Sequence, residues 1–503
     1  MKTDHLSQQE LESYLWGAAT LLRGLIDASD YKQYIFPLLF FKRLSDVWDE
    51  DYREAFEDSQ DEAYATATAN DRFTIPPGAH WRDARNASRD VGRALLTAFQ
   101  AIEAANPHRL QGVFGNAAWT DKAQIPDETL KNLIEHFSHH TLSLTNVPED
   151  ELGNGYEYLI KQFADDSGHT AQEFYTNRTL VHLMAQMLEP KAGETIYDPT
   201  CGTGGMLISC LAEAKRNGGD TRTMGLYGQE LINITAAIAR MNLVLHGVSD
   251  FDIRSGNTLH EPALIEGDRL KTFDVVLANP PYSIKKWNRE AWQSDPWGRN
   301  FLGTPPQGRA DYAFFQHILK SMDSETGRCA ILFPHGVLFR KDEAELRRNL
   351  VASDIVECVL GLGPSLFYNS PMEACVVVCR SNKPEHRRGK ILFIDAVHEI
   401  VREKSQSFLL AEHQSRILDT YRAFGNETAF AATATTEEVL SQNGDLTVHH
   451  YVVRKTTESA IESTVSLAES WSRFDAQGRD FWILMDELAE ALHSEASEEA
   501  SDV

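Results

Sequence analysis

The chain has 503 residues, of which 42% are hydrophobic and 24% are charged, an ordinary composition that excludes wholesale disorder. Lys and Arg total 48 and Asp and Glu total 74, so the formal net charge is −26. A free-standing protein that grips DNA phosphates over a wide face would not carry this charge. Any basic surface must therefore be local or supplied by a partner, and the length implies about two to four domains.

Residues 1–150 are expected to form a helical domain. Apolar side chains recur every three or four positions from Leu11 to Leu25, which is the period of an amphipathic helix, and Tyr34–Trp48 is a second, more apolar segment. The apolar run Tyr34–Phe41 is too short to span a bilayer. The N-terminus also lacks the apolar core of a signal peptide, so we expect a cytoplasmic protein.

From about residue 190, short apolar runs alternate with helical stretches. This pattern predicts an α/β domain over residues 151–430, built on a doubly wound, mostly parallel sheet. Ligands of such sheets bind at the carboxyl ends of the strands. The predicted strands are 194–199, 224–230, 273–281, 328–334, 354–360 and 373–379.

Residues 431–503 are expected to form a linker and a C-terminal helical tail. The polar stretch 426–445 predicts a linker or a weakly ordered crossing, and apolar residues from Phe481 to Leu492 share one face of a helix. From Asp486 onward the chain carries acidic residues and no Lys or Arg. Two interpretations stay open for this tail: a solubilising extension, or a helix that docks on a partner.

The glycine-rich segment Asp198–Gly205 follows a predicted strand and precedes a predicted helix. Its glycines permit positive φ and let a ligand approach the backbone. The spacing is neither that of a dinucleotide fold nor that of a P-loop. An Asp ahead of such a turn suits a ligand with a cationic amine, such as S-adenosylmethionine (AdoMet), although a plain strand-to-helix turn is the alternative. Glu230, at the end of the next strand, is suited to binding ribose hydroxyls, although a solvated carboxylate is the alternative.

The segment Asn279–Tyr282 (NPPY) directly follows the apolar strand FDVVLA. The Asn279 amide oxygen and the Pro280 carbonyl can accept hydrogen bonds from one planar amino group, which would polarise its nitrogen lone pair toward an electrophile. Tyr282 offers a face on which a planar base can stack, and the prolines fix the backbone. Together with the glycine-rich segment, this motif predicts a transfer reaction at an amino group.

The segment Ser283–Ala310 mixes positive charge with aromatic side chains in an otherwise acidic chain. Such mixtures contact phosphates and stack unpaired bases, while the alternative is an ordinary lid with buried tryptophans. Its basic residues, which are candidate DNA contacts, are Lys285, Lys286, Arg289, Arg299 and Arg309, against only Glu290 and Asp295.

The six cysteines indicate neither a metal site nor disulfides. None of them belongs to a CxxC pair, and no group of histidines supplies metal-ligand spacing. We therefore expect reduced, mostly buried thiols and no metal.

Taken together, these segments resemble the modification (methyltransferase) subunit of type I restriction–modification systems, in the γ group of N6-adenine DNA methyltransferases. The order of the motifs along the chain also matches that group. The resembling segments are Leu15–Asp46, Gln172–Thr176, Asp198–Gly205, Asn279–Tyr282, Gly308–Leu319 and Gly327–Arg340.

The resemblance implies transfer of a methyl group from AdoMet to N6 of a flipped-out adenine in duplex DNA. By this resemblance the catalytic residues are Asn279, Pro280, Pro281 and Tyr282. The implied AdoMet-binding residues are Phe174, Tyr175, Thr176, Asp198, Thr200, Gly202, Thr203, Gly204, Glu230 and Asn257.

Two positions depart from the family pattern. The family usually has Pro where Asn177 stands, and it often has Asp where Asn257 stands. Asn257 can still hydrogen-bond an adenine edge, and neither departure touches the NPPY motif.

The resemblance also implies partners. These are a separate specificity subunit that reads the DNA sequence, a second copy of this subunit, a restriction subunit that is a translocase and nuclease, and double-stranded DNA. The net charge of −26 is then explained, because this chain presents only one catalytic face to DNA. We expect negligible DNA affinity for the isolated chain.

Three alternatives stay open. Glutamine N5-methyltransferases that act on release factors also carry NPPY, but they are much shorter. A catalytically inactive scaffold for the specificity subunit would not need both motifs intact. Methylation of cytosine N4 is chemically similar, although Asn rather than Ser before PPY favours adenine. The chain lacks the Pro-Cys pair that a cytosine C5-methyltransferase would need.

Overall fold

The computed structural model describes residues 5–166, 177–364, 366, 373–403 and 406–453. The chain divides into the unit 1–453, which holds all of these residues, and the unit 454–503. The predicted acidic tail helix lies outside the described residues. None of the helices in the described part is long and apolar enough to cross a membrane.

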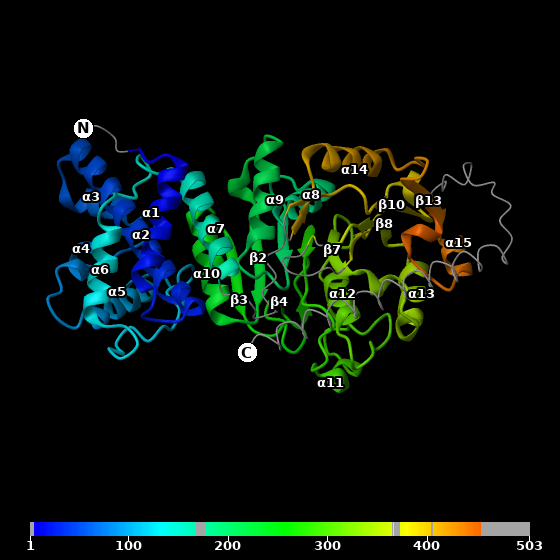
Figure 1. Cartoon of the computed structure of the whole chain (residues 1–503), viewed down its shortest axis with the longest axis horizontal. Helices are drawn as coiled ribbons and strands as arrows, with labels where there is room; N and C mark the ends of the chain where they lie inside the picture. The colour runs from blue at the N-terminus through cyan, green and yellow to red at the C-terminus, as the bar shows by residue number, and fades with distance from the viewer. Residues whose placement is uncertain (1–4, 167–176, 365, 367–372, 404–405, 454–503) are drawn as a thin grey trace, which may run out of the picture. The chain divides into compact units, whose positions relative to one another are not determined.

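The N-terminal part of the chain is helical, as Figure 1 shows. The first helix begins with a capping box, in which the Ser7 side chain accepts from the Glu10 amide and the Glu10 carboxylate accepts from the Ser7 amide. The helices are α1 Gln8–Leu22, α2 Tyr31–Ser59, α3 Glu62–Ala69, α4 Trp81–Arg85, α5 Val91–Ala105, α6 Asp127–Phe137 and α7 Glu149–Asp166, with the 3₁₀ turn η1 Ala28–Asp30.

A nine-stranded sheet follows, in the order β13-β10-β8-β9-β7-β6-β1-β2-β3. Seven strands run in one direction, and β9 and β13 run antiparallel to their neighbours. The expected doubly wound, mostly parallel sheet is therefore confirmed. The strands are β1 Thr195–Asp198, β2 Gly225–Glu230, β3 Phe251–Ser255, β6 Val275–Ala278, β7 Arg328–Pro334, β8 Val356–Leu362, β9 Ala374–Arg380, β10 Lys390–Ala396 and β13 Ala431–Thr435, with the small ladders β4 Ile265–Glu266 with β5 Arg269–Leu270 and β11 Val401–Glu403 with β12 Gln406–Phe408.

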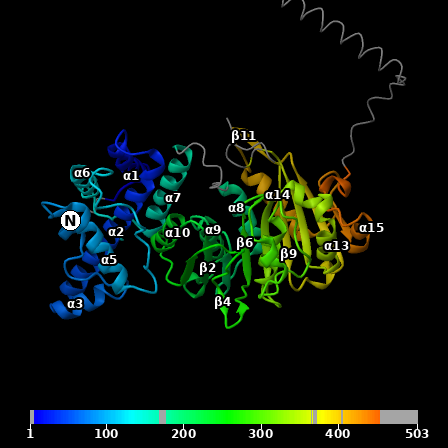
Figure 2. The same ribbon diagram turned by 90° about the horizontal axis from the view of Figure 1, so that it is seen from below.

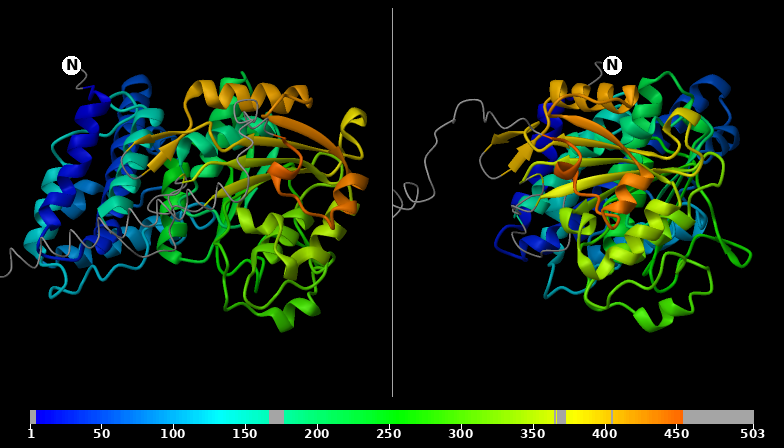
Figure 3. Two further views of the ribbon diagram at one scale, coloured as in Figure 1. Left: turned by 45° about the vertical axis from the view of Figure 1, so that its right-hand side comes forward. Right: turned by 90° about the vertical axis from the view of Figure 1, so that its right-hand side faces the viewer.

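Helices cover both faces of the sheet (Figures 1 and 3). Successive strand residues point to opposite faces, so Ile196 joins the core beneath α8, α9 and α14, whereas Tyr197 joins the core beneath α12 and α13. The helices are α8 Arg178–Leu188, α9 Gly205–Arg216, α10 Asn233–Leu245, α11 Arg289–Gln293, α12 Asp311–Lys320, α13 Ala344–Ala352, α14 Ala411–Ala423 and α15 Thr436–Ser441, with the 3₁₀ turns η2 Thr221–Thr223, η3 His335–Leu338, η4 Lys341–Glu343, η5 Glu385–Arg387 and η6 Val448–His450.

Helix α10 joins the helical part to the sheet. It packs against α2 and α7 on one side and against β2 and β3 on the other, an arrangement visible in Figure 2. The Tyr156 hydroxyl of α7 donates to the Ile238 carbonyl of α10 at 3.3 Å. The residues of α10 that belong to the N-terminal hydrophobic core are Ala237, Ile238, Met241 and Leu245.

The predicted linker over 426–445 is wrong. Residues 431–435 form the edge strand β13, which pairs with β10, and residues 436–441 form α15. The strand was missed because its Ala-Thr sequence lacks the large apolar residues that mark a buried strand. Its edge position requires only one partner, and Ala434 packs into the core. Strands β3 and β10 were also not predicted.

Candidate active site

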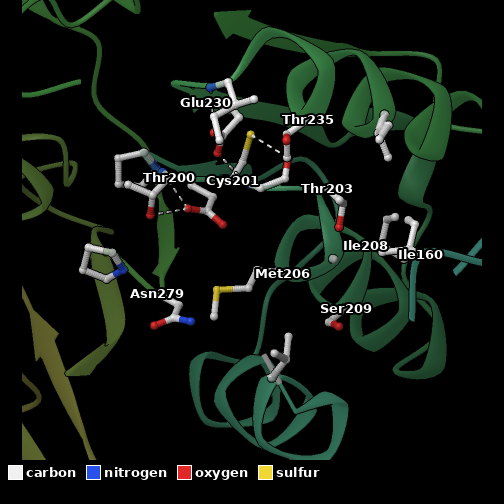
Figure 4. A pocket seen from close by; sticks show the side chains of 18 of the residues that line it. Ile160, Thr200, Cys201, Thr203, Met206, Ile208, Ser209, Glu230, Thr235 and Asn279 are labelled. Carbon is white, nitrogen blue, oxygen red and sulfur yellow. Dashed lines mark hydrogen bonds between the residues drawn. The ribbon is translucent and has the colours of Figure 1, made fainter. Parts of the chain in front are cut away.

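A cavity of about 1980 Å³ lies at the carboxyl ends of the central strands. The Asp198 loop after β1, Glu230 of β2, Asn257 after β3 and Asn279 after β6 all line it. Figure 4 shows Thr200, Glu230 and Asn279 around this one pocket, with Met206 between the loop and Asn279. The cavity also extends to helices α2 and α7, where Lys32 and Glu157 line it. The Asp198 loop and the Asn279–Tyr282 segment, which forms the NPPY corner of the site, therefore share one cleft.

The glycine-rich loop turns sharply between β1 and α9. Gly202 and Gly204 have φ of +53° and +83°, in the left-handed region where a Cβ is strained. The Cys201 amide donates to the Gln229 carbonyl of β2 at 3.0 Å, which joins the loop to the neighbouring strand. A Cβ on Gly202 or Gly205 would meet no heavy atom within 4 Å. The loop backbone therefore faces open space that a ligand can approach closely.

Asp198 is buried at the start of this loop, with 2% of its surface exposed. Its Oδ1 accepts a hydrogen bond from the Thr200 amide at 2.9 Å. Burial raises the pKa of Asp198 to about 7, and the nearby Glu230 charge adds to the rise, while the Thr200 hydrogen bonds oppose it. Ionisation of this buried carboxyl group is unfavourable, so a cation bound beside it would strongly stabilise its charged form.

Glu230 connects the end of β2 to the loop. One carboxylate oxygen accepts from the Gly202 amide at 3.0 Å, and the other accepts from the Ile232 amide at 2.9 Å. The side chain is half-buried and lines the cavity. It therefore fixes the position of Gly202, a role that the sequence did not predict, while its contact with ribose hydroxyls stays a prediction.

Two residues behind the loop were missed by the sequence analysis. The buried Asn242 of α10 donates from its amide nitrogen to the Thr203 carbonyl at 2.9 Å. The Thr258 hydroxyl donates to the Pro199 carbonyl at 2.6 Å. A polar residue within the apolar face of the helix 233–245 was the available signal for Asn242, and Thr258 directly follows the predicted contact Asn257.

Asn257 is exposed at the cavity. Its Oδ1 accepts from the amides of Leu259 and His260 at 3.0 and 3.2 Å, so the side chain caps the turn that follows β3. The oxygen is therefore engaged, and the amide nitrogen is the group that Asn257 presents to a ligand.

The NPPY segment begins where β6 ends. The Asn279 side chain is half-buried and lines the cavity, and the Tyr282 hydroxyl donates to its Oδ1 at 2.7 Å. Burial holds the pKa of Tyr282 well above its ordinary value, so this hydroxyl stays a donor. Because an amide oxygen has two lone pairs, the Asn279 oxygen can accept a second hydrogen bond from a ligand.

The next residue, Ser283, has φ of +52°. Its amide donates to Oδ1 of Asp311 at 2.8 Å, and Nη1 of Arg340 donates to the other oxygen of Asp311 at 2.6 Å. Asp311 lies in the segment Gly308–Leu319, one of the segments that resemble the family, and no role was predicted for its side chain.

The candidate DNA contacts divide into three groups. Lys285 and Lys286 are exposed at the cavity. Arg289 donates to the Pro305 carbonyl at 2.8 Å, and Arg309 pairs with Asp342 at 2.8 Å. Arg299 has only 1% of its surface exposed, so its prediction as a DNA contact is wrong.

Arg299 instead stabilises the segment 283–310 through buried contacts. It forms an ion pair with Asp295 at 2.6 Å, and its guanidinium lies 4.5 Å from the ring centre of Trp292. It also donates to the carbonyls of Thr258 and Leu259 at 2.8 and 2.9 Å. Of the three tryptophans in this segment, Trp292 is buried, whereas Trp287 and Trp297 are half-buried, so the expectation of buried tryptophans is met only at Trp292.

Three predicted AdoMet contacts, Phe174, Tyr175 and Thr176, lie outside the described residues. The neighbouring Asn177, which stands where the resembling family usually has Pro, is the N-cap of α8. It accepts from the Thr179 amide at 3.0 Å and donates to the Ser407 carbonyl at 2.8 Å. A Pro at this position could make neither bond.

Two family models match consecutive parts of the chain. The family model for N-6 DNA Methylase matches residues 147–460, and that for the HsdM N-terminal domain matches residues 11–137. The methylase subunit of the type I restriction enzyme HindI from Haemophilus influenzae is 31% identical over 72% of this chain and 83% of its own length. That of MjaIX from Methanocaldococcus jannaschii is 27% identical over 92% of this chain and 87% of its own length.

Solved structures are also similar. The methyltransferase subunit of a type I restriction-modification system from Streptococcus thermophilus superposes with a TM-score of 0.78 at 30% identity, covering 89% of this chain and 100% of that one. A modification subunit of a putative type I restriction enzyme from Vibrio vulnificus gives a TM-score of 0.68 at 19% identity, covering 92% and 100%, a likeness of fold.

Proposed function

The chain belongs to the N-6 DNA methylase family and is a type I restriction enzyme methylase subunit, and from this premise we propose how its cleft methylates N6 of adenine in DNA. The observation that carries the proposal is that the Asp198 loop and the Asn279–Tyr282 corner line one cavity of about 1980 Å³. Such a cavity can hold a methyl donor and an extruded base side by side.

The loop side of the cavity fits AdoMet. The buried Asp198 carboxylate matches the cationic amine of the amino-acid portion, and the open backbone at Gly202 allows close approach. Glu230 offers acceptors to the ribose, and the Asn257 amide nitrogen offers a donor to the adenine edge. Bound there, AdoMet would supply an electrophilic methyl group. The other cofactor-binding residues in the proposal are Phe174, Tyr175, Thr176, Thr200, Thr203 and Gly204.

Apolar side chains beside Glu230 support this assignment. Leu231 and Ile232 are 63% and 39% exposed, and both line the cavity. Exposed aliphatic residues at the end of a buried strand are unfavourable in water but suit the face of a purine ring. They were not predicted from the sequence.

The corner side of the cavity fits the amino group of adenine. We propose that the Asn279 amide oxygen and the Pro280 carbonyl accept hydrogen bonds from the two N6 hydrogens. Both bonds favour an N6 lone pair that points away from the ring plane. Catalysis is then mainly positioning and polarisation, with no covalent intermediate. Pro281 fixes the backbone, and Tyr282 orients Asn279 and packs against the base.

Partners complete the proposal. With a net charge of −26, the chain has little long-range attraction for DNA. We propose that a specificity subunit reads the DNA sequence, that a second copy of this chain and a restriction subunit join the complex, and that the complex acts on double-stranded DNA in the cytoplasm. Lys285 and Lys286 supply local phosphate contacts, and Arg289 and Arg309 are weaker candidates because each already has a protein partner.

The experiment that tests this function identifies the methylated nucleoside. The chain is combined with a specificity subunit, duplex DNA and isotope-labelled AdoMet, and the digested DNA is analysed by mass spectrometry. We expect label in N6-methyladenine. Label in N4-methylcytosine would contradict the assigned base, and AdoMet binding without any transfer would favour the inactive scaffold.

A further inference from the structure

The buried carboxylate of Asp311 bridges two segments beside the NPPY corner. Asp311 has 1% of its surface exposed and is the first residue of α12. An Asp at this position commonly serves the amino end of a helix. Here Oδ1 accepts from the Ser283 amide at 2.8 Å and Oδ2 accepts from Arg340 at 2.6 Å. One carboxylate oxygen therefore binds the backbone directly after the NPPY segment, and the other binds a guanidinium.

Ser283 needs a restraint of this kind. Its φ of +52° lies in the left-handed region, which residues with a Cβ rarely adopt unless their surroundings hold them there. Ser283 directly follows Tyr282, whose hydroxyl orients the Asn279 oxygen. A change of backbone conformation at Ser283 would therefore move the Tyr282 side chain and release the Asn279 amide.

Arg340, which donates to the second oxygen of Asp311, also contacts a buried carboxyl group. Arg340 follows β7, and its side chain also forms an ion pair of 3.5 Å with Glu343, whose side chain is fully buried. Burial raises the pKa of Glu343 to about 7. The bridge therefore connects the segment after β6 to the start of α12 and to the segment after β7.

We propose that Asp311 is a positioning residue for methyl transfer, which holds Ser283 in the left-handed conformation and so fixes Tyr282 and Asn279 for the amino group. This inference rests on the proposed function of the corner. Asp311 touches neither the base nor AdoMet in this account, and its effect passes through the Ser283 backbone.

The test compares Asp311→Ala, Ser283→Gly and the double variant, each assembled with a specificity subunit. A displacement of the corner by about 1 Å should lower kcat about 100-fold in Asp311→Ala, with the KM for AdoMet within about twofold because the Asp198 loop is untouched. Since glycine adopts positive φ without strain, Ser283→Gly in the Asp311→Ala background should recover about tenfold in kcat. Asp311→Asn, which keeps an acceptor oxygen, should lose less than Asp311→Ala.

A matched control distinguishes positioning from general loss of structure. Asp274 accepts the Thr195 amide at 2.9 Å and the Thr195 hydroxyl at 2.8 Å, at the opposite end of the strands. Asp274→Asn should lower the melting temperature but leave kcat within about twofold. An equal loss of kcat in Asp274→Asn, or no recovery from Ser283→Gly, would overturn the proposal.

Hydrogen exchange of the Ser283 amide in the purified chain gives a readout that does not need activity. Exchange should accelerate in Asp311→Ala, because the amide loses its acceptor. An unchanged exchange rate would overturn the restraint. If the wild-type complex transfers no methyl group, the proposed function fails, whereas the exchange result still decides the role of Asp311.

Discussion

The Tyr282 hydroxyl donates a 2.7 Å hydrogen bond to the amide oxygen of Asn279. This bond orients the Asn279 amide at the cavity, where an amide oxygen can accept more than one hydrogen bond. The sequence suggested Tyr282 only as a stacking surface. Its hydroxyl adds a second role, which is to orient the Asn279 amide that we propose as the acceptor for the target amino group.

The two roles of Tyr282 can be separated by substitution. Tyr282→Phe keeps the ring but loses the hydrogen bond, which is worth about 1 kcal/mol, so kcat/KM should fall about fivefold. Tyr282→Ala also loses the stacking surface, worth about 1–3 kcal/mol more, and should fall about 100-fold. Steady-state methylation kinetics measure both. If Phe and Ala cost the same, the hydroxyl rather than the ring carries the effect.

The raised pKa of Asp198 predicts that AdoMet binding depends on pH. With a pKa of about 7 in the free protein, the carboxylate is mostly protonated at pH 5.5 and half ionised at pH 7. Only the ionised form attracts the cationic amine, so affinity should rise about tenfold over this interval. Titration calorimetry at several pH values measures the rise. Asp198→Asn should bind weakly and show no such rise, and an equal pH dependence in that variant would assign it to another group.

The same raised pKa predicts that the contribution of Asp198 to folding stability falls with rising pH, whereas AdoMet affinity rises. Because the folded state keeps Asp198 protonated well above the ordinary pKa of a carboxyl, the unfolded state binds fewer protons between about pH 4 and pH 7. The contribution of this residue to stability therefore falls as pH rises through that window. Asp198→Asn should unfold at higher denaturant concentration than the wild type at pH 7, by a margin that shrinks at pH 4.

Lys285 and Lys286 should govern the salt dependence of DNA binding. Each substitution to Gln should weaken binding of the assembled complex across DNA sequences and reduce the slope of log affinity against log salt by about 1. AdoMet binding should not change. The control is Lys390→Gln, which removes an exposed lysine at the opposite end of the sheet. A slope that changes as much in this control would indicate a general charge effect.

Arg299 should behave as a structural residue. Arg299→Met would leave the buried carboxylate of Asp295 without its cation, so the free energy of unfolding should fall by roughly 3–5 kcal/mol. Denaturant unfolding measures this loss. The salt slope of DNA binding should stay that of the wild type, and a slope reduced by about 1 would return Arg299 to the phosphate contacts.

The sequence located the two corners because both follow short buried strands, whose carboxyl ends meet at one edge of a parallel sheet. The sequence could not show that Arg299 is buried and Lys285 is exposed, because both are basic residues of the same segment. It could not reveal Asp311 either, since that carboxylate reaches Ser283 across 28 residues of chain. The pairing of 431–435 with β10 likewise depends on tertiary contact.

Substitution of Asn279 tests the account most directly. AdoMet affinity and methyl transfer are measured on the same preparation of Asn279→Ala, assembled with a specificity subunit and duplex DNA. Asn279 is the proposed acceptor for the target amino group and is separate from the Asp198 loop along the cavity lining. We therefore expect an AdoMet Kd within about twofold of the wild type and no detectable N6-methyladenine. Transfer at the wild-type rate would contradict it.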